Sequence, residues 1–349
     1  MEHSKVSILG HYGFGQNLLN GQTIKTKVLS EALCNHYGKE LVLKVDTHGG
    51  VRILLRAPFQ TFKVLKNSKN VVMLPAHNGL RVYTPLLVFE KCFFKGRKLH
   101  YVVIGGWLPE FLQKRKWLSN LLKTFDGIYV ETNTMKQALE KQGFSNIYVM
   151  PNCKDLQILA EEELVYPNGT PFKLCTFSRV MKEKGIEDAV NAVRAVNEAL
   201  GQIVYTLDIY GQVDAAQTAW FETLKANFPE YVYYKGCVDS DKSVDILKGY
   251  LALLFPTHFF TEGVPGTIID AYAAGIPVIS AKWESYADVI DDRKTGIAYS
   301  FLDEADFKRI LMHVANEPQV LLGLKRKCLQ KAHEYMPSVV IKTLIKNFM

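Results

Sequence analysis

The sequence alternates along most of its length between short apolar runs and longer segments with helical apolar spacing. Runs such as KVSILG (5–10), LHYVVIGGW (99–107) and FKLCTFSRV (172–180) have the length and the Val, Ile and Leu content of buried strands. Helical segments follow them, for example GIEDAVNAVRAVNEAL (185–200). Strands that alternate with helices predict parallel sheets covered on both faces. We therefore expect an α/β protein built from doubly wound, Rossmann-like layers.

The alternation is interrupted once, in a segment with an acidic cluster and a Pro-Asn-Gly turn. We expect an N-terminal Rossmann-like domain over 1–152, a linker over 153–171 and a C-terminal Rossmann-like domain over 172–330. The 349 residues, 48% of them hydrophobic, are sufficient for two separate cores. Two such domains that face each other would leave a cleft at the carboxyl ends of their strands, where ligands bind.

The distribution of charge limits the kinds of partner. Residues 1–150 contain 21 Lys and Arg but only 9 Asp and Glu, a net charge of +12, whereas the remainder has a net charge of −5. The segments KVLKNSK, KCFFKGRK and FLQKRKWLSNLLK mix cations with Phe, Trp and Leu, which suits an anionic membrane surface. A solvated helix face is the alternative. We expect no nucleic-acid partner, because no motif that reads DNA or RNA is present.

The same composition indicates a cytoplasmic location. No apolar run reaches the roughly 18 residues of a membrane-spanning helix, and the start MEHSKVSILGHYG lacks the apolar core of a secretory signal. The six cysteines are scattered without metal-binding spacing, which is typical of reduced thiols in the cytosol. The basic segments add the possibility of peripheral attachment to the inner face of the membrane.

The most informative stretch is FFTEGVPGTIIDAYAAGIPVI (259–279), which follows the strand-like LALLFP. Gly263 and Gly266 let the backbone approach a ligand closely, and the amides at the start of the next helix form an anion site suited to phosphate. The carboxylates of Glu262 and Asp270 can accept hydrogen bonds from sugar hydroxyls. Together they indicate a sugar-nucleotide site; an ordinary strand–helix junction with an acidic first turn is the alternative.

The pattern E-G-x-P-x-x-x-x-D-A-x-x-x-G-x-P-V-I closely resembles the donor-site signature of family GT4 of the GT-B glycosyltransferases. That family has two glutamates separated by seven residues. Glu262 matches the first, and Asp270, which is one methylene shorter, occupies the second position. The resemblance implies a GT-B fold, with two Rossmann-like domains facing across a cleft, and a C-terminal helix over 331–349 that returns to the first domain.

Three further segments resemble the same family in the same order. FSRVMKEKGIEDAVNAV (177–193) is similar to its GR…KG segment, which implies that Arg179 and Lys184 bind the donor diphosphate and stabilise it as it leaves. DIYGQ (208–212) and YKGCV (234–238) match a glycine loop and a stretch that contacts the base. The resemblance thus implies donor contacts from Ser178, which replaces the family's glycine, and from Gly211, Val238, Gly263, Val264, Gly266, Thr267 and Asp270.

The first domain is expected to contribute to donor and acceptor binding. Gly13 and Gly15 lie in GHYGFGQN (10–17), which is not a G-x-G-x-x-G motif, so a nicotinamide cofactor is not indicated. In GT-B transferases the corresponding loop reaches across the cleft toward donor and acceptor, and NGQTIKT (20–26) resembles the helix start after it. A structural turn is the alternative.

Two further strand ends in the first domain carry candidate acceptor contacts. His77 and Asn78, in PAHNG, and Trp107, in IGGWLPE, are candidates to hold a hydroxyl-rich acceptor, with Trp107 as a stacking platform. Many family members have a histidine where this chain has Gly105-Gly106, so that role is not transferred.

These resemblances imply a retaining glycosyltransferase, of hexosyl or N-acetylhexosaminyl type, that uses a nucleotide diphosphate sugar, most simply a UDP-sugar, and a glycan or lipid-linked acceptor. Glu262 would hold the sugar hydroxyls, and Arg179 and Lys184 the leaving diphosphate. We expect no cofactor and no catalytic metal, since the nucleotide sugar is a co-substrate and no DxD triplet is present. A sugar-nucleotide epimerase of the same fold and a non-catalytic nucleotide-sugar-binding partner of a membrane glycan assembly complex are the alternatives.

Overall fold

The computed structural model describes residues 4–16, 21–50, 53 and 55–348, and the chain divides into two compact units. Unit 1 comprises residues 1–155 and 335–349, and unit 2 comprises 156–334. Most of the segment expected as a linker therefore belongs to unit 2. The reason is local packing: Leu156 and Leu159 are buried, and the Leu159 amide donates to the Ala273 carbonyl at 2.9 Å.

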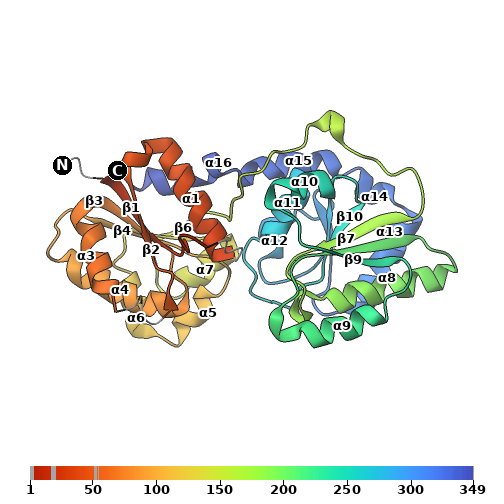
Figure 1. Cartoon of the computed structure of the whole chain (residues 1–349), viewed down its shortest axis with the longest axis horizontal. Coiled ribbons are helices and arrows are strands. Elements are labelled where there is room, and N and C mark those ends of the chain that lie inside the picture. The colour runs from red at the N-terminus through yellow and green to blue at the C-terminus, as the bar shows by residue number, and fades with distance from the viewer. Residues whose placement is uncertain (1–3, 17–20, 51–52, 54, 349) are drawn as a thin grey trace. The chain divides into compact units, whose positions relative to one another are not determined.

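Unit 1 contains a parallel six-stranded sheet in the order β2-β1-β3-β4-β5-β6 (Figure 1). Its strands are β1 (Ser4–Gly10), β2 (Val42–Asp46), β3 (Ser68–Met73), β4 (Lys98–Val102), β5 (Gly127–Val130) and β6 (Ile147–Val149). The first strand pairs with β2 on one side and β3 on the other, with Val6 opposite Val42 and Asn70. Most residues of these strands are buried, because both faces of the sheet are covered.

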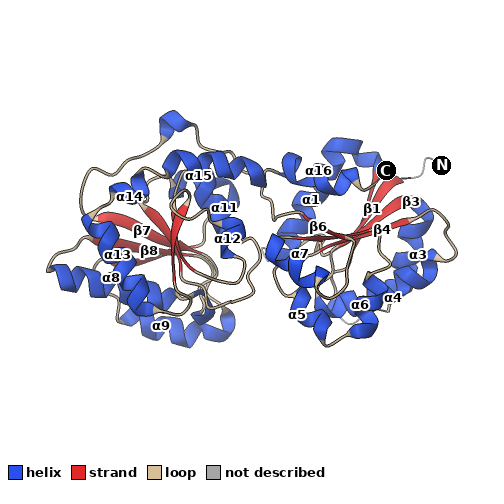
Figure 2. Ribbon diagram, turned by 180° about the vertical axis from the view of Figure 1, so that it is seen from behind, coloured by secondary structure: helices blue, strands red, loops and turns tan. Residues whose placement is uncertain are grey.

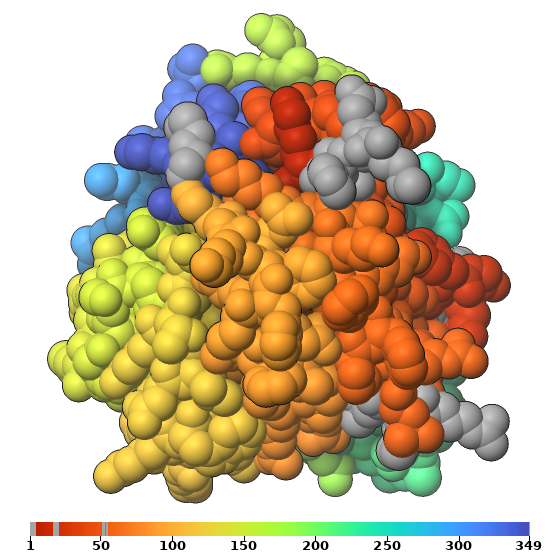
Figure 3. All heavy atoms as spheres, turned by 90° about the vertical axis from the view of Figure 1, so that its left-hand side faces the viewer, coloured from red at the N-terminus to blue at the C-terminus, as the bar shows by residue number. Residues whose placement is uncertain are grey.

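Helices cover both faces of this sheet (Figure 2). They are α1 (Gly21–Tyr37), α3 (Ala57–Asn67), α4 (His77–Lys91), α5 (Leu108–Gln113), α6 (Lys116–Leu122), α7 (Asn133–Glu140) and α16 (Pro337–Lys346). Side chains of α1 and α16 form one core with Ile8 and Val72, while α3 to α7 form the other with Leu9 and Val71. Alternate residues of a strand thus enter opposite cores. Figure 3 shows one face of unit 1, to which α3 and α4 contribute.

Unit 2 repeats this architecture with a parallel sheet in the order β12-β11-β10-β7-β8-β9. The strands are β7 (Phe172–Phe177), β8 (Tyr205–Tyr210), β9 (Val232–Gly236), β10 (Ala252–Phe255), β11 (Val278–Ala281) and β12 (Gly296–Tyr299). The helices are α8 (Ile186–Leu200), α9 (Thr218–Ala226), α10 (Ser243–Leu247), α11 (Gly266–Ala273), α12 (Tyr286–Val289), α13 (Glu304–Asn316), α14 (Gln319–Leu322) and α15 (Lys325–Ala332).

The predicted fold class is confirmed, because each unit is a doubly wound parallel α/β layer. Helix α8 illustrates how the sequence produces it: Ala189, Val193 and Val196 recur at helical spacing and are buried against β7 and β8. Glu187 lies in its first turn, where the helix dipole favours an acid, and Gly201 ends it in the left-handed conformation. Among the described residues, no helix has the length and apolarity needed to cross a bilayer.

Candidate functional site

The strand order of each sheet identifies where a ligand is expected. In unit 2 the first strand, β7, lies between β8 and β10, so the chain connections diverge at the carboxyl ends of β7 and β10. In unit 1 the corresponding point lies between β1 and β3. Open α/β sheets bind ligands at such topological switch points. The loops that leave these four strands contain most of the predicted site residues.

At the switch point of unit 2, Lys184 and Glu262 come together. Lys184 ends the short 3₁₀ helix Lys182–Lys184 after β7, and Glu262 lies in the loop between β10 and α11. The Lys184 ammonium is ion-paired with Oε1 of Glu262, which also accepts a hydrogen bond from Thr257 Oγ1 at 3.1 Å. The two side chains are 18% and 16% exposed. A sheltered, opposite-charge pair at a switch point is a strong candidate for ligand contact.

Gly185 brings the two loops into contact. It adopts φ +67°, and a Cβ at this position would lie 1.9 Å from the Pro256 carbonyl oxygen. Only glycine permits both the left-handed conformation and this approach. The amide of His258 donates to the Glu183 carbonyl at 2.8 Å, which ties the same loops together. The close packing of these two loops therefore fixes Lys184 beside Glu262.

The start of α11 forms the other side of this site. Pro265 is its N-cap residue in an extended conformation, and the amides of Gly266 and Thr267 precede the first intrahelical hydrogen bond. Oγ1 of Thr267 is shielded from solvent and has no hydrogen-bond partner among the described residues. Buried polar atoms usually have a partner, so a ligand oxygen would complete this group. The helix dipole favours an anion here.

Arg179 lies on the same loop as Lys184 but has a different partner. Its Nη1 is 3.6 Å from Asp214 Oδ2, and its side chain is 54% exposed. The backbone around it packs on the loop after β8, since a Cβ on Gly211 would lie 1.8 Å from the Ser178 carbonyl oxygen. Val238 is half-buried in the loop after β9. The loop placement of Arg179, Ser178 and Gly211 follows from strand order, and their contacts to a donor stay predictions.

Asp270 differs from Glu262 in its surroundings. It lies within α11 and is only 2% exposed, and its Oδ1 accepts a hydrogen bond from Ser243 Oγ at 3.0 Å. Gly263 and Val264, which follow Glu262 in the same loop, are likewise buried. A contact from Asp270 to a donor ribose would require its carboxylate to become accessible, so this role also stays a prediction.

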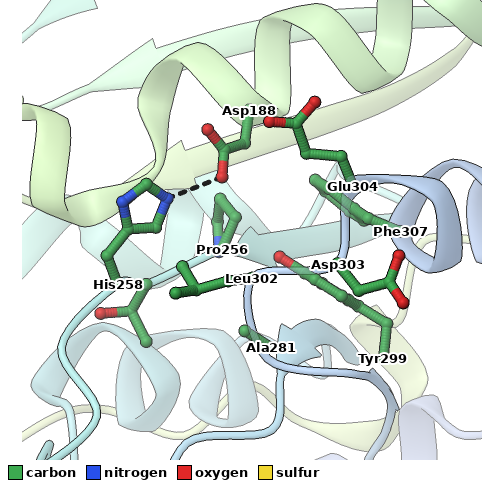
Figure 4. A pocket seen from close by; sticks show the side chains of 10 residues that line it. Asp188, Pro256, His258, Ala281, Tyr299, Leu302, Asp303, Glu304 and Phe307 are labelled. Carbon is green, nitrogen blue, oxygen red and sulfur yellow. Dashed lines mark hydrogen bonds and ion pairs between the residues drawn. The ribbon is translucent and has the colours of Figure 1, made fainter.

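A narrow pocket is lined in part by Thr257 and its neighbours Pro256 and His258 (Figure 4). His258 Nε2 and Asp188 Oδ2 are 2.7 Å apart in it, which links the β10–α11 loop to α8. Tyr299 and Phe307 line the pocket with Leu302. The His258–Asp188 contact helps to fix the loop that carries Glu262. Sequence reasoning did not identify this pair.

In unit 1, an open cavity of about 410 Å³ lies at the switch point between β1 and β3. Loops after three neighbouring strands line it: His11 follows β1, His48 follows β2, and His77 and Asn78 follow β3. Gln22 of α1 completes this polar lining. The predicted acceptor contacts His77 and Asn78 are thus exposed to one cavity.

Two histidines of this cavity form a hydrogen-bonded chain that the sequence analysis missed. His11 Nε2 is 2.9 Å from His48 Nδ1, and His11 Nδ1 is 2.7 Å from Thr23 Oγ1. Burial, and then the neighbouring His48, lower the pKa of His11. The available signal was position alone, because each histidine follows a predicted strand. Within the described residues, no group of three or more His, Cys, Asp or Glu side chains is arranged to hold a metal ion.

Asp46 organises the loop before these histidines. Its carboxylate accepts hydrogen bonds from the amides of Tyr12, Phe14 and His48 at 2.8 to 3.0 Å. Burial raises its pKa, but these backbone donors outweigh burial and hold the pKa of Asp46 below its usual value. Gly13 and Gly15 adopt positive φ in the same loop, with Gly13 buried and Gly15 exposed. Asn17 and Asn20, named in the two predicted loop motifs, lie outside the described residues.

The third predicted acceptor residue, Trp107, lies against His77. The two rings stack with centroids 3.9 Å apart, and Trp107 Nε1 donates to the Ile104 carbonyl at 2.8 Å. Burial, followed by the nearby Arg81 and Arg115, lowers the pKa of His77. His77 is therefore a neutral ring at neutral pH, which suits hydrogen bonds to hydroxyls. Trp107 thus packs against the His77 ring, and its role as a stacking platform for an acceptor stays a prediction.

Comparison with known proteins agrees with this geometry. Residues 171–317 match the family model described as Glycosyl transferases group 1, which covers most of unit 2. No curated protein matches the chain in sequence. Structural similarity to TarM of S. aureus, solved with fondaparinux, α-GlcNAc-glycerol and UDP, has a TM-score of 0.66 at 17% identity. That match covers 85% of this chain, which spans 59% of the TarM chain.

Two other solved structures match over nearly their whole length. Anabaena HepE, in complex with UDP and glucose, has 13% identity and a TM-score of 0.73, with 99% of each chain covered. The lipopolysaccharide outer core galactosyltransferase WaaB has 15% identity and a TM-score of 0.70, with 98% of each chain covered. The expected resemblance to GT-B glycosyltransferases is confirmed, while the narrower GT4 assignment stays a prediction. The chain thus has the GT-B fold, and its second unit matches the group 1 glycosyl transferases.

Proposed function

We propose that the protein is a glycosyltransferase that moves a sugar from a nucleotide diphosphate sugar, most simply a UDP-sugar, to a hydroxyl of a glycan or lipid-linked saccharide. The observation that carries this proposal is the sheltered Lys184–Glu262 pair beside the start of α11. The match of residues 171–317 to group 1 glycosyl transferases supports it. So do the UDP complexes of TarM and HepE, which share the fold.

The unit 2 site offers distinct groups for each part of such a donor. The amides of Gly266 and Thr267, with Lys184, would hold the diphosphate, and Arg179 would reach it from its exposed position. Glu262 would accept hydrogen bonds from the sugar hydroxyls once Lys184 turns to the phosphate. Positive charge fixed at the diphosphate stabilises the charge that develops on the leaving group, which lowers the barrier to transfer.

The remaining parts of the proposal concern stereochemistry and acceptor. We assign a retaining course, a hexosyl or N-acetylhexosaminyl donor, and an acceptor hydroxyl in the unit 1 cavity near His77 and Asn78. The leaving phosphate would take the acceptor proton, as the resemblance implies. A role in polysaccharide synthesis at an anionic membrane fits the net charge of +12 over residues 1–150.

A thermal-shift series tests the donor assignment directly. UDP and UDP-sugars should raise the melting temperature in a concentration-dependent manner, because a ligand that binds only the folded state stabilises it. Wild-type protein should then release UDP in the presence of a saccharide acceptor, with the product anomer identified by NMR. Stabilisation by UDP without transfer to any acceptor would instead favour a binding module, and absence of any nucleotide effect would overturn the proposal.

A further inference from the structure

A second hollow of unit 1, which we call the aromatic–basic groove, is separate from the histidine cavity. It has a volume of about 640 Å³ and an open mouth. Its lining residues are Phe14, Lys44, Val45, Asp46, Arg56, Phe59, Gln60 and Lys63. Three cations and two large aromatic rings therefore border one shallow apolar hollow. Nothing in the donor chemistry uses these residues.

The three cations of the groove form no ion pair with any other described residue. No carboxylate lies within ion-pair distance of Lys44, Arg56 or Lys63 in the part of the chain that the structure describes. The one acid of the lining, Asp46, accepts three backbone hydrogen bonds instead. With three cations against one carboxylate, the lining of the groove has a net positive charge, which an anion would neutralise.

Aromatic side chains extend this groove into a larger apolar surface. Phe59 on α3 is 79% exposed, and Phe93, just after α4, is 71% exposed. Phe62 is half-exposed and contacts Phe94 with ring centroids 5.2 Å apart, which joins α3 to the segment that follows α4. Single exposed apolar residues are common in soluble proteins, but a contiguous cluster indicates an interaction site.

The groove shares a wall with the histidine cavity. Gln60 Nε2 donates to the Asp46 carbonyl at 2.9 Å, and Tyr83 OH donates to Gln60 Oε1 at 2.6 Å. Gln60 lines the groove, whereas Tyr83 and His48 line the cavity. A molecule that occupied both sites would place a negatively charged, apolar part beside Phe59 and a hydroxyl-rich part beside His48.

We propose that the aromatic–basic groove binds an anionic membrane lipid. Its phosphate lies among Lys44, Arg56 and Lys63, its acyl chains contact Phe14 and Phe59, and the exposed rings of α3 and α4 enter the headgroup layer. Cations interleaved with large apolar side chains are the chemistry of an anionic bilayer surface, and a free phosphate would leave the aromatic rings uncovered. One further step rests on the proposed function. If the lipid is a lipid-linked acceptor, its saccharide would reach the histidine cavity.

Co-sedimentation of the full chain with vesicles tests the proposal. Wild type should bind vesicles of phosphatidylcholine mixed with phosphatidylglycerol, and should not bind phosphatidylcholine alone. The triple variant Lys44→Gln, Arg56→Gln and Lys63→Gln should bind roughly a hundredfold more weakly, since each cation near an anionic surface contributes about a fivefold factor. The matched control Lys39→Gln, Lys141→Gln and Lys346→Gln removes the same charge outside the groove and should lose much less.

A second pair of variants separates a lipid from a simple anion. Phe59→Ser with Phe93→Ser leaves the charge unchanged and should weaken vesicle binding about tenfold or more. The control variant Tyr166→Ser with Tyr233→Ser removes two exposed rings of unit 2 and should not weaken vesicle binding. Three outcomes would each overturn the proposal. They are an equal loss of vesicle binding in the two triple variants, full vesicle binding by the Phe variant, and equal sedimentation of wild type with neutral vesicles. UDP stabilisation, measured on the same proteins, should persist in all of them; its absence would count against the donor assignment and not against the groove.

Discussion

The Lys184 ammonium and the Glu262 carboxylate form an ion pair that joins the loop after β7 to the loop after β10. In the absence of a donor, each group thus satisfies the other in a sheltered place where an unpaired charge would be costly. Under the proposed function, a diphosphate would take over Lys184 and sugar hydroxyls would take over Glu262. Donor binding would therefore exchange partners and leave neither group unpaired.

Substitution of Lys184 by Met should weaken UDP binding and transfer together. The change removes one charge-assisted hydrogen bond to phosphate, for which a loss of about tenfold to hundredfold in affinity is expected. Titration calorimetry with UDP measures it. Lys182→Met is the matched control, since Lys182 is exposed two residues earlier and lies over the Trp220 ring. Similar losses in both variants would argue against a specific role for Lys184.

Substitution of Glu262 by Gln should reduce transfer much more than UDP affinity. The amide keeps the side-chain volume and the contact with Thr257 but removes the charge that would stabilise a positive centre at the sugar. We expect a loss of roughly a hundredfold or more in kcat, by analogy with the loss of one transition-state contact. Steady-state kinetics with a UDP-sugar, beside UDP titration, provide the measurement. A parallel loss of UDP affinity would instead place Glu262 at the nucleotide.

The close backbone approach at Gly185 predicts that an alanine at this position destabilises the folded protein strongly. Gly185→Ala would place Cβ 1.9 Å from the Pro256 carbonyl oxygen, a backbone atom that cannot rotate away, at φ +67°. Gly201→Ala is a matched control: its φ is +63°, but nothing lies within 4 Å of its Cβ. The control should lose about 1 kcal/mol from the left-handed conformation alone, and Gly185→Ala clearly more. Chemical denaturation of both variants, followed by circular dichroism, separates the two effects.

Much of this fold could be predicted from apolar patterning, but residue pairing could not. The strand-like runs, such as KVSILG and FKLCTF, coincide with β1 and β7 because buried parallel strands are continuously apolar. By contrast, Lys184 and Glu262 are 78 residues apart, and only the adjacency of β7 and β10 brings them together. Strand order depends on the whole sheet, so no local motif in the sequence predicts this ion pair.

The errors in secondary structure have local causes. The apolar spacing of RILLRAPFQTFKVLKNSKN (52–70) predicts one basic helix, but only α3 is described there, because Ser68–Met73 pairs with β1 instead. Arg52 and Leu54 of this run lie outside the described residues. The run PEFLQKRKWLSNLLKTF (109–125) predicts a single helix, but it is divided between α5 and α6. The short strand β12 was not predicted, since four residues that begin with glycine carry little signal. The His11–His48 contact was missed because the residues come from different strand ends.

The cavity of unit 1 predicts a selective effect on the acceptor. His77→Ala should raise the acceptor KM about tenfold, from the loss of a hydrogen bond and of the ring that covers Trp107, while the donor KM changes little. His313→Ala, on α13 of unit 2, is the control and should change neither. Burial and two arginines lower the pKa of His77, so the acceptor KM should stay constant above pH ~6.5. A rise in the donor KM with an unchanged acceptor KM would contradict the assignment.

Stability of unit 1 should decrease as the pH falls because of His100. This residue is fully buried on β4, its Nδ1 lies 3.1 Å from Tyr129 OH, and burial lowers its pKa from 6.5 to about 4. The folded state thus holds the neutral ring, whereas the unfolded chain takes up a proton below pH ~6.5. The stabilising contribution is complete above that pH and is lost between pH ~6.5 and ~4, by up to about 3 kcal/mol. Scanning calorimetry should show this slope in wild type and a flatter one in His100→Gln, which cannot titrate; equal slopes would mean that other groups govern the acid sensitivity of unit 1.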